Sequence, residues 1–188
     1  MSFDQIVATV TAVATMLTAI IAWAAIFSQR KQQLTSLQAN ILRDFILEFS
    51  NKEHMRETRE LASQFALQRL AGRTQNEPTP AAVFHLIDFF DNLAVYYNKG
   101  TLDREMAFSG LYYWISHYWA TYKSDITAFE ANTGLKTYAN IARMVDDLDK
   151  IGRKLKRISP AFTFSPDRLR QFFEDEISEC ARRNKHVE

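Results

Sequence analysis

The sequence predicts an all-α protein, with one N-terminal transmembrane helix that continues into a cytosolic bundle of about five further helices. Three observations support this prediction. The chain of 188 residues holds only 5 Gly and 4 Pro, too few for an all-β protein, which needs a turn about every 8–12 residues. Hydrophobic residues make up 47% of the chain, which is enough for a packed core. Beyond an apolar N-terminal run, the apolar residues recur at helical spacing.

An uncharged segment of 25 residues, Gln5–Gln29, is the predicted transmembrane helix. A helix of that length spans about 37 Å, more than the roughly 30 Å of hydrocarbon in a bilayer. Arg30 and Lys31 follow it, so the positive-inside rule places the rest of the chain in the cytoplasm. Residues 1–33 are expected to form the anchor and juxtamembrane segment, and residues 34–188 a helical cytosolic domain. A cleaved signal peptide and a buried helix of a soluble bundle are the alternatives.

Small residues and threonines share one face of this N-terminal helix. At about 100° per residue, that face holds Ala8, Thr11, Thr15, Thr18 and Ala22. Small side chains let membrane helices approach closely, and threonine hydroxyls hydrogen bond across such contacts. The face is therefore expected either to pack against another copy of the chain or another protein's helix, or to line a pore. In a third alternative each threonine bonds to its own helix and the face meets lipid.

The next two helices are predicted from their ends. No Gly or Pro interrupts residues 3–50, so the first helix is expected to continue beyond the membrane. Ser50 with Glu53 resembles a capping box that starts the second helix. Gly72 is a natural residue just past its end. Thr79 as N-cap, followed by Pro80, begins the third helix.

The remaining helices follow from similar signals. Gly100 ends the third helix. The fourth is expected to start near Thr101–Asp103 and to run to about Ala131, and the fifth is expected from about Leu135 to Ile158. Ser165 is the expected N-cap of the sixth. The aromatic cluster between Tyr112 and Tyr122 is dense enough to form a core and to project one or two rings outward, and a ligand cage is the less favoured alternative.

The segment from Val83 to Ile126 resembles a widespread bacterial family of helical domains, domain of unknown function 4760. The residues that carry the likeness are Ile87–Ala94 (IDFFDNLA), Tyr97–Asp103 (YNKGTLD), Tyr112–Ile115 (YYWI) and Tyr118–Trp119 (YW). Members of that family are similar in outline, with one N-terminal anchor followed by a helical cytosolic domain. The resemblance implies an architecture and no activity. It agrees with a place in the bacterial inner membrane, with the C-terminal domain in the cytoplasm.

One group of polar residues resembles a metal site. His85, Asp88 and Asp91 are spaced by three and share one side of a helix, and a His with two carboxylates could hold a metal. The simpler expectation is that the aspartates cap, pair or face water. His117, set among aromatic residues, is expected to be a half-buried packing residue. No phosphate-binding loop, nucleophile elbow or Cys–His motif occurs, so no cofactor is expected and an RNA-acting helical enzyme is the least favoured function.

A basic amphipathic segment lies at the end of the predicted fifth helix. Its cations are Lys150, Arg153, Lys154, Lys156 and Arg157. Such a segment could contact anionic lipid head groups or RNA phosphates. No aromatic residues alternate with the cations, which makes nucleic acid the weaker option. Neighbouring aspartates favour a solvated face of paired charges instead.

These features together predict a non-enzymatic interaction module that is anchored in the membrane and self-associates through its N-terminal helix. The expected partners are membrane lipid, other copies of the chain and another protein bound by the helical body. The alternative is an oligomeric pore or a membrane-perturbing effector or accessory of a bacterial antiviral defence system. That alternative rests on layout alone, since small membrane accessory proteins of CRISPR systems share it.

Overall fold

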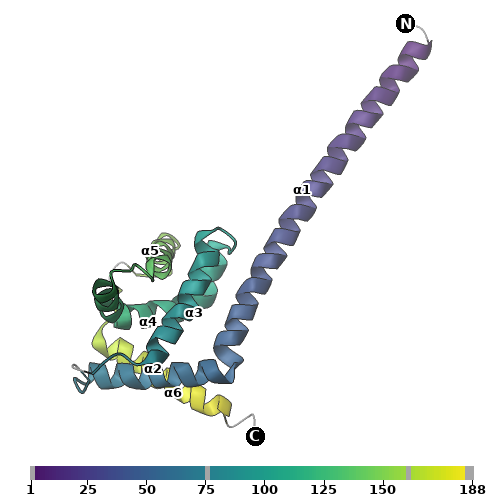
Figure 1. Ribbon diagram of the computed structural model, residues 1–188. Coiled ribbons are helices and arrows are strands. Elements are labelled where there is room, and N and C mark those ends of the chain that lie inside the picture. The colour runs from purple at the N-terminus through teal and green to yellow at the C-terminus, as the bar shows by residue number, and fades with distance from the viewer. Residues whose placement is uncertain (1–2, 75–76, 160–161, 185–188) are drawn as a thin grey trace. The chain divides into compact units, whose positions relative to one another are not determined.

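The computed structural model describes residues 3–74, 77–159 and 162–184, and within them the side chains of 4–10, 12–14 and 184 lie outside the description. Over the described residues the chain forms six α-helices and no strand, so the all-α prediction is confirmed. The helices are α1 (Phe3–Asn51), α2 (Glu53–Leu70), α3 (Ala81–Asn98), α4 (Arg104–Thr133), α5 (Ala139–Lys154) and α6 (Pro166–Asn184) (Figure 1).

The chain divides into two compact units, Met1–Asn40 and Ile41–Glu188, which are described separately. The first unit is the N-terminal part of α1. Its large apolar side chains are exposed wherever they are described: Phe3, Met16, Leu17, Ile20, Ile21, Trp23, Ile26, Phe27, Leu34 and Leu37. Trp23 and Phe27 stack on each other with ring centroids 5.8 Å apart. This unit thus presents apolar surface that nothing within the unit covers.

Among the residues that the structure describes, no helix is both long enough and apolar enough to cross a membrane. The expected transmembrane helix is therefore not supported. Four strongly apolar residues of the uncharged run, Ile6, Val7, Val10 and Val13, have side chains outside the description.

The second unit contains the end of α1 and the five other helices. In it α2 lies along α6, α3 packs against α2 and α5, and α4 contacts α3, α5 and α6 (Figure 1). The core is rich in aromatic rings. Phe49, at the end of α1, contacts Phe90 and Trp114 with centroid distances of 5.5 Å in each case. Tyr118 and Tyr122 are fully buried while Tyr113 is 54% exposed, so α4 both fills the core and projects a ring outward.

Two predicted helix starts are off by one or two residues. Ser50 lies inside α1, and the N-cap of α2 is Lys52, which makes no side-chain capping bond. The capping box of Ser50 and Glu53 is therefore wrong. The reason is that α1 continues to Asn51, so only Lys52 separates the two helices. The N-cap of α3 is Pro80 and not Thr79.

The fifth helix is shorter than its apolar spacing suggests. It begins at Ala139 and ends at Lys154, because Lys156 adopts a left-handed backbone with φ 56°. The Lys156 N–H then donates to the Arg153 carbonyl at 3.0 Å, and the Arg157 N–H to the Gly152 carbonyl at 2.9 Å. This is the hydrogen-bond pattern of a Schellman motif, in which glycine is the usual residue. The predicted cap of α6 is present, since Ser165 Oγ accepts from the Arg168 N–H at 3.4 Å.

A buried ionic network connects α2, α4 and α6. Arg59 donates to Glu176, and Trp114 Nε1 and the Tyr118 hydroxyl donate to the same carboxylate at 3.0 Å and 3.2 Å. Cys180, one turn further along α6, is completely buried. Burial raises the pKa of its thiol, and nearby Arg59 opposes that effect. Every polar group of this network has a partner, which is the condition under which buried charges are tolerated.

Candidate functional site

The predicted face of the N-terminal helix is only partly described. Ala8 lies outside the described side chains, whereas Thr11, Thr15, Thr18 and Ala22 are exposed. The Thr15 hydroxyl donates to the backbone carbonyl of Thr11 at 2.9 Å. At this position the hydroxyl proton therefore bonds within its own helix, and only the oxygen lone pairs remain for a neighbour. The small face is thus better suited to close packing than to donating hydrogen bonds through Thr15.

The predicted polar site on α3, His85, Asp88 and Asp91, lies beside the start of α5, and its aspartates accept hydrogen bonds from that helix. Asp91 accepts from the Ile141 N–H at 2.9 Å and from Asn140 Nδ2 at 3.3 Å. Burial raises the pKa of Tyr138, and a hydrogen bond from its hydroxyl to Asp88 adds to the effect. His85 is exposed. No group of His, Cys, Asp or Glu side chains in the described part of the chain could hold a metal ion. Both aspartates accept hydrogen bonds from the start of α5, Asp91 from the Ile141 N–H and Asp88 from the Tyr138 hydroxyl.

The predicted basic segment is divided by the end of α5. Lys150 pairs with Asp146 at 2.5 Å, and Arg153 pairs with Asp149 at 2.7 Å, each across one helical turn. Lys154 and Lys156 are exposed. Arg157 lies past the helix end and donates to Ser109 Oγ on α4 at 2.8 Å. The five cations therefore do not form one continuous helical face, because the left-handed turn at Lys156 redirects the chain.

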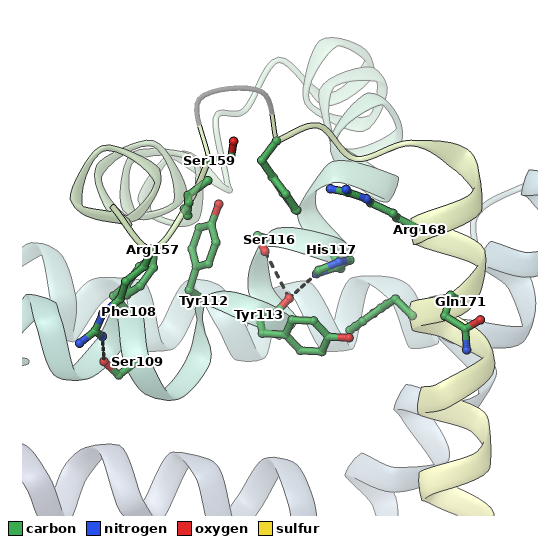
Figure 2. A pocket seen from close by; sticks show the side chains of 13 residues that line it. Phe108, Ser109, Tyr112, Tyr113, Ser116, His117, Arg157, Ser159, Arg168 and Gln171 are labelled. Carbon is green, nitrogen blue, oxygen red and sulfur yellow. Dashed lines mark hydrogen bonds between the residues drawn. The ribbon is translucent and has the colours of Figure 1, made fainter. Parts of the chain in front are cut away.

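A pocket of about 640 Å³ lies in the second unit, between α4, the segment that joins α5 to α6, and the first turns of α6 (Figure 2). Its volume is within the range of roughly 300–1,000 Å³ that is usual for small-molecule sites. Six rings line it: Phe108, Tyr112, Tyr113, His117, Phe162 and Phe172. The remaining lining residues are mostly polar: Ser109, Ser116, Arg157, Ile158, Ser159, Arg168 and Gln171.

His117 lies in the pocket wall and is nearly buried, with 7% of its surface exposed. Its Nδ1 is 2.6 Å from the Tyr113 carbonyl oxygen. A carbonyl only accepts, so Nδ1 carries the proton and Nε2 of the neutral ring is an acceptor. Burial lowers the pKa of His117, and the bond to Tyr113 partly opposes this. The ring stacks on Phe172 at a centroid distance of 4.3 Å, so it is held rigidly.

The electrostatic character of the pocket comes from two arginines. Arg168, in the first turn of α6, holds its guanidinium over the Phe162 ring at 5.0 Å. Arg157 bonds to Ser109. No Asp or Glu lines the pocket, and neither arginine forms an ion pair with a carboxylate among the described residues. In the view of Figure 2, Arg157 and Arg168 lie on opposite sides of the pocket, with His117 between them.

Sequence reasoning found only fragments of this pocket. It placed Arg157 in a basic segment, Tyr112 and Tyr113 in an aromatic cluster, and His117 as a half-buried packing residue. His117 packs among aromatic rings and is more deeply buried than expected, with 7% of its surface exposed. Arg168 and Phe162 carry no motif. The pocket lies between α4 and residues on either side of the start of α6. These segments are far apart in the sequence, so the spacing of residues does not show that they meet.

The fold and the site define the class of the protein: an all-α domain that carries a long N-terminal helix and an aromatic, positively charged pocket. The family model for the domain of unknown function DUF4760 matches residues 12–148. This match covers more than half of the chain, and the protein belongs to the DUF4760 family, as the sequence likeness had indicated. The matched span ends within α5, so α6 and its Arg168 lie outside it. No curated protein and no solved structure matches the chain significantly.

Proposed function

We propose that this protein is a non-enzymatic interaction module of the bacterial inner membrane, held at the bilayer by the N-terminal part of α1 and self-associating through it. The observation that carries the proposal is the exposure of large apolar side chains along this helix. Ile20, Ile21, Trp23 and Phe27 are each more than half exposed. Contiguous apolar surface of this kind marks a membrane or protein contact.

The sequence supports lipid as the first partner. Gln5–Gln29 carries no formal charge, and Arg30 and Lys31 follow directly. Such an order suits a helix whose apolar part enters the hydrocarbon and whose basic end meets the anionic cytoplasmic surface. The second unit then lies in the cytoplasm, where its helices are available to another protein.

The small face supports self-association. A membrane helix gains little from burying apolar groups against each other, so association depends on close packing and on hydrogen bonds. Thr11, Thr15, Thr18 and Ala22 leave room for a second helix backbone. Because the Thr15 proton bonds to Thr11, we attribute the contact chiefly to the small size of these side chains.

Two experiments test the proposal. After alkaline carbonate treatment the full-length chain should stay in the membrane pellet, and deletion of residues 1–33 should release it. The mass of the detergent-solubilised particle should exceed that of one chain. Thr15→Leu should lower that mass because its larger side chain separates the helices. Thr15→Val, which keeps the size and removes the hydroxyl, should leave the mass unchanged, and so should Ile20→Leu on the bulky face.

Each possible outcome has a clear meaning. Full-length chain in the soluble fraction would refute membrane attachment. A single-chain particle would refute self-association. Leakage of a small dye from liposomes that hold the wild-type protein, abolished by Thr15→Leu while the particle mass is unchanged, would replace dry packing by a water-lined pore. A ring of leucines at a narrow radius closes such a pore by dewetting.

A further inference from the structure

The pocket of the second unit is not part of the proposed anchor, and it has the features of a ligand site. It is concave and of ordinary small-molecule volume, about 640 Å³. Six aromatic side chains line it, and polar groups converge on it between them. We propose that it binds a small phosphate ester that carries a planar ring, of the size and chemistry of a mononucleotide.

The charge of the pocket selects an anion. Arg157 and Arg168 both line it, and no carboxylate does. The guanidinium of Arg168 uses its flat face against Phe162, which leaves the N–H groups at its edge to hydrogen bond. These edge N–H groups match the oxygens of a phosphate in a two-pronged arrangement. Arg168 also lies in the first turn of α6, where the helix dipole adds positive potential.

The walls select a planar ring. Tyr113 is 54% exposed and offers ring surface to a ligand. Phe162 is only partly buried and offers the ring face that the Arg168 guanidinium does not cover. Aromatic side chains bind flat rings by offset stacking or by edge contact. The rigid neighbours hold these walls in place, since His117 stacks on Phe172 and Tyr113 contacts Phe172 at 5.3 Å. The acceptor Nε2 of His117 supplies a polar contact that orients a ring with exocyclic donor groups. Ser116 instead supports the wall, because it is 2% exposed and its hydroxyl donates to the Tyr113 carbonyl at 3.2 Å.

The arrangement of the two arginines gives each a role. Arg168 binds the phosphate directly. Arg157, on the other side in Figure 2, raises the positive potential of the whole pocket and closes the end beside Ser109. An aliphatic phosphate such as a detergent-like lipid fragment would satisfy Arg168 but would leave the ring surfaces without a stacking partner.

Isothermal titration calorimetry on the full-length chain in detergent micelles tests the proposal. The probes are AMP, CMP, GMP and UMP, with adenosine, ribose 5-phosphate and octyl phosphate as partial ligands. At least one mononucleotide should bind saturably, and about tenfold more tightly than each partial ligand. Arg168→Gln should weaken that binding by about tenfold or more, the usual range for a charged hydrogen bond. Arg157→Gln should weaken it by about threefold or more.

Arg170→Gln is the matched control. Arg170 lies on the same helix, is exposed and pairs with Asp167 outside the pocket, so binding should change by less than about twofold. An unchanged circular dichroism melting curve shows that each variant is folded. The proposal is overturned if no mononucleotide binds at 1 mM, if octyl phosphate binds as tightly as the best mononucleotide, or if Arg170→Gln weakens binding as much as Arg168→Gln.

Discussion

Arg59 and Glu176 form a buried ion pair in which Nε and Nη2 of the arginine both donate to one carboxylate oxygen, at 2.9 Å and 2.6 Å. The two residues are 117 positions apart in the sequence, and the pair fixes α6 to α2. Arg59 Nη1 donates in addition to the Phe49 carbonyl of α1 at 3.1 Å. Burial is the largest single influence on the pKa of Arg59 and lowers it, but Glu176, Tyr118 and Cys180 together outweigh burial, so the pKa is raised.

Glu176→Ala should lower the free energy of unfolding by about 3–5 kcal/mol, the usual cost of removing one partner from a buried ion pair. The guanidinium of Arg59 then loses its counter-charge, and Trp114 Nε1 loses its acceptor. Glu174→Ala, at an exposed position of the same helix, should change stability by less than about 0.5 kcal/mol. Urea unfolding of the full-length chain in mild detergent measures both. Equal effects would show that the pair does not hold α6.

Asp91→Ala should cost about 1–2 kcal/mol, because the Ile141 N–H at the start of α5 loses its acceptor. His85→Ala should have an effect near zero, since that side chain is exposed. The measurement is the melting temperature, taken with and without EDTA. EDTA should leave the wild-type value unchanged. The metal site considered from the sequence would be supported by a different result, in which EDTA lowers the melting temperature of the wild type but not that of Asp91→Ala.

Lys156→Gly should stabilise the protein by up to about 1 kcal/mol. A left-handed backbone costs a residue with a Cβ about 1–2 kcal/mol, and the greater freedom of glycine in the unfolded chain offsets about half of that gain. Lys154→Gly, at the last residue of α5, should instead destabilise by about 0.5–1 kcal/mol. Chemical denaturation compares the two. If both substitutions destabilise equally, the turn at Lys156 is not strained.

The stability of the protein should fall as the pH falls below about 6.5, the ordinary pKa of histidine. Burial lowers the pKa of His117 in the folded state, so between the two pKa values the unfolded chain binds more protons and unfolding becomes easier. His117→Gln should flatten the change in urea midpoint between pH 7.5 and pH 5.5. His85→Gln, at an exposed site, should keep the wild-type slope. A slope that His117→Gln does not alter would assign the effect to other groups.

The fold was largely predictable because its helix ends carry local signals. Gly72 and Gly100 have φ values of 74° and 72°, which glycine adopts most readily, so residue type alone marked those ends. The end of α5 was misplaced for the converse reason. Lys156 takes the same backbone conformation, and a lysine gives no sign of it in the sequence.

The pocket could not be predicted, because its residues come from helices that meet only after folding. Phe108, Ile158 and the backbone of Gly152 illustrate this. A Cβ at Gly152 would lie 2.3 Å from Ile158 Cδ1 and 2.5 Å from Phe108 Cε2, so α5 approaches α4 this closely only without a side chain there. In the sequence this glycine lies within a helical apolar pattern, and nothing there indicates that it allows close packing of two helices.

The complete burial of Cys180 makes the single thiol a reporter of motion in the C-terminal helix. Alkylating reagents attack the thiolate, and burial both raises the pKa of this thiol and excludes the reagent. Reaction at Cys180 therefore requires α6 to separate transiently from α2, and its rate under native conditions counts those openings. Reaction at Ser124→Cys, an exposed position on α4, needs no such opening, so the ratio of the two rates gives the fraction of time that α6 is detached.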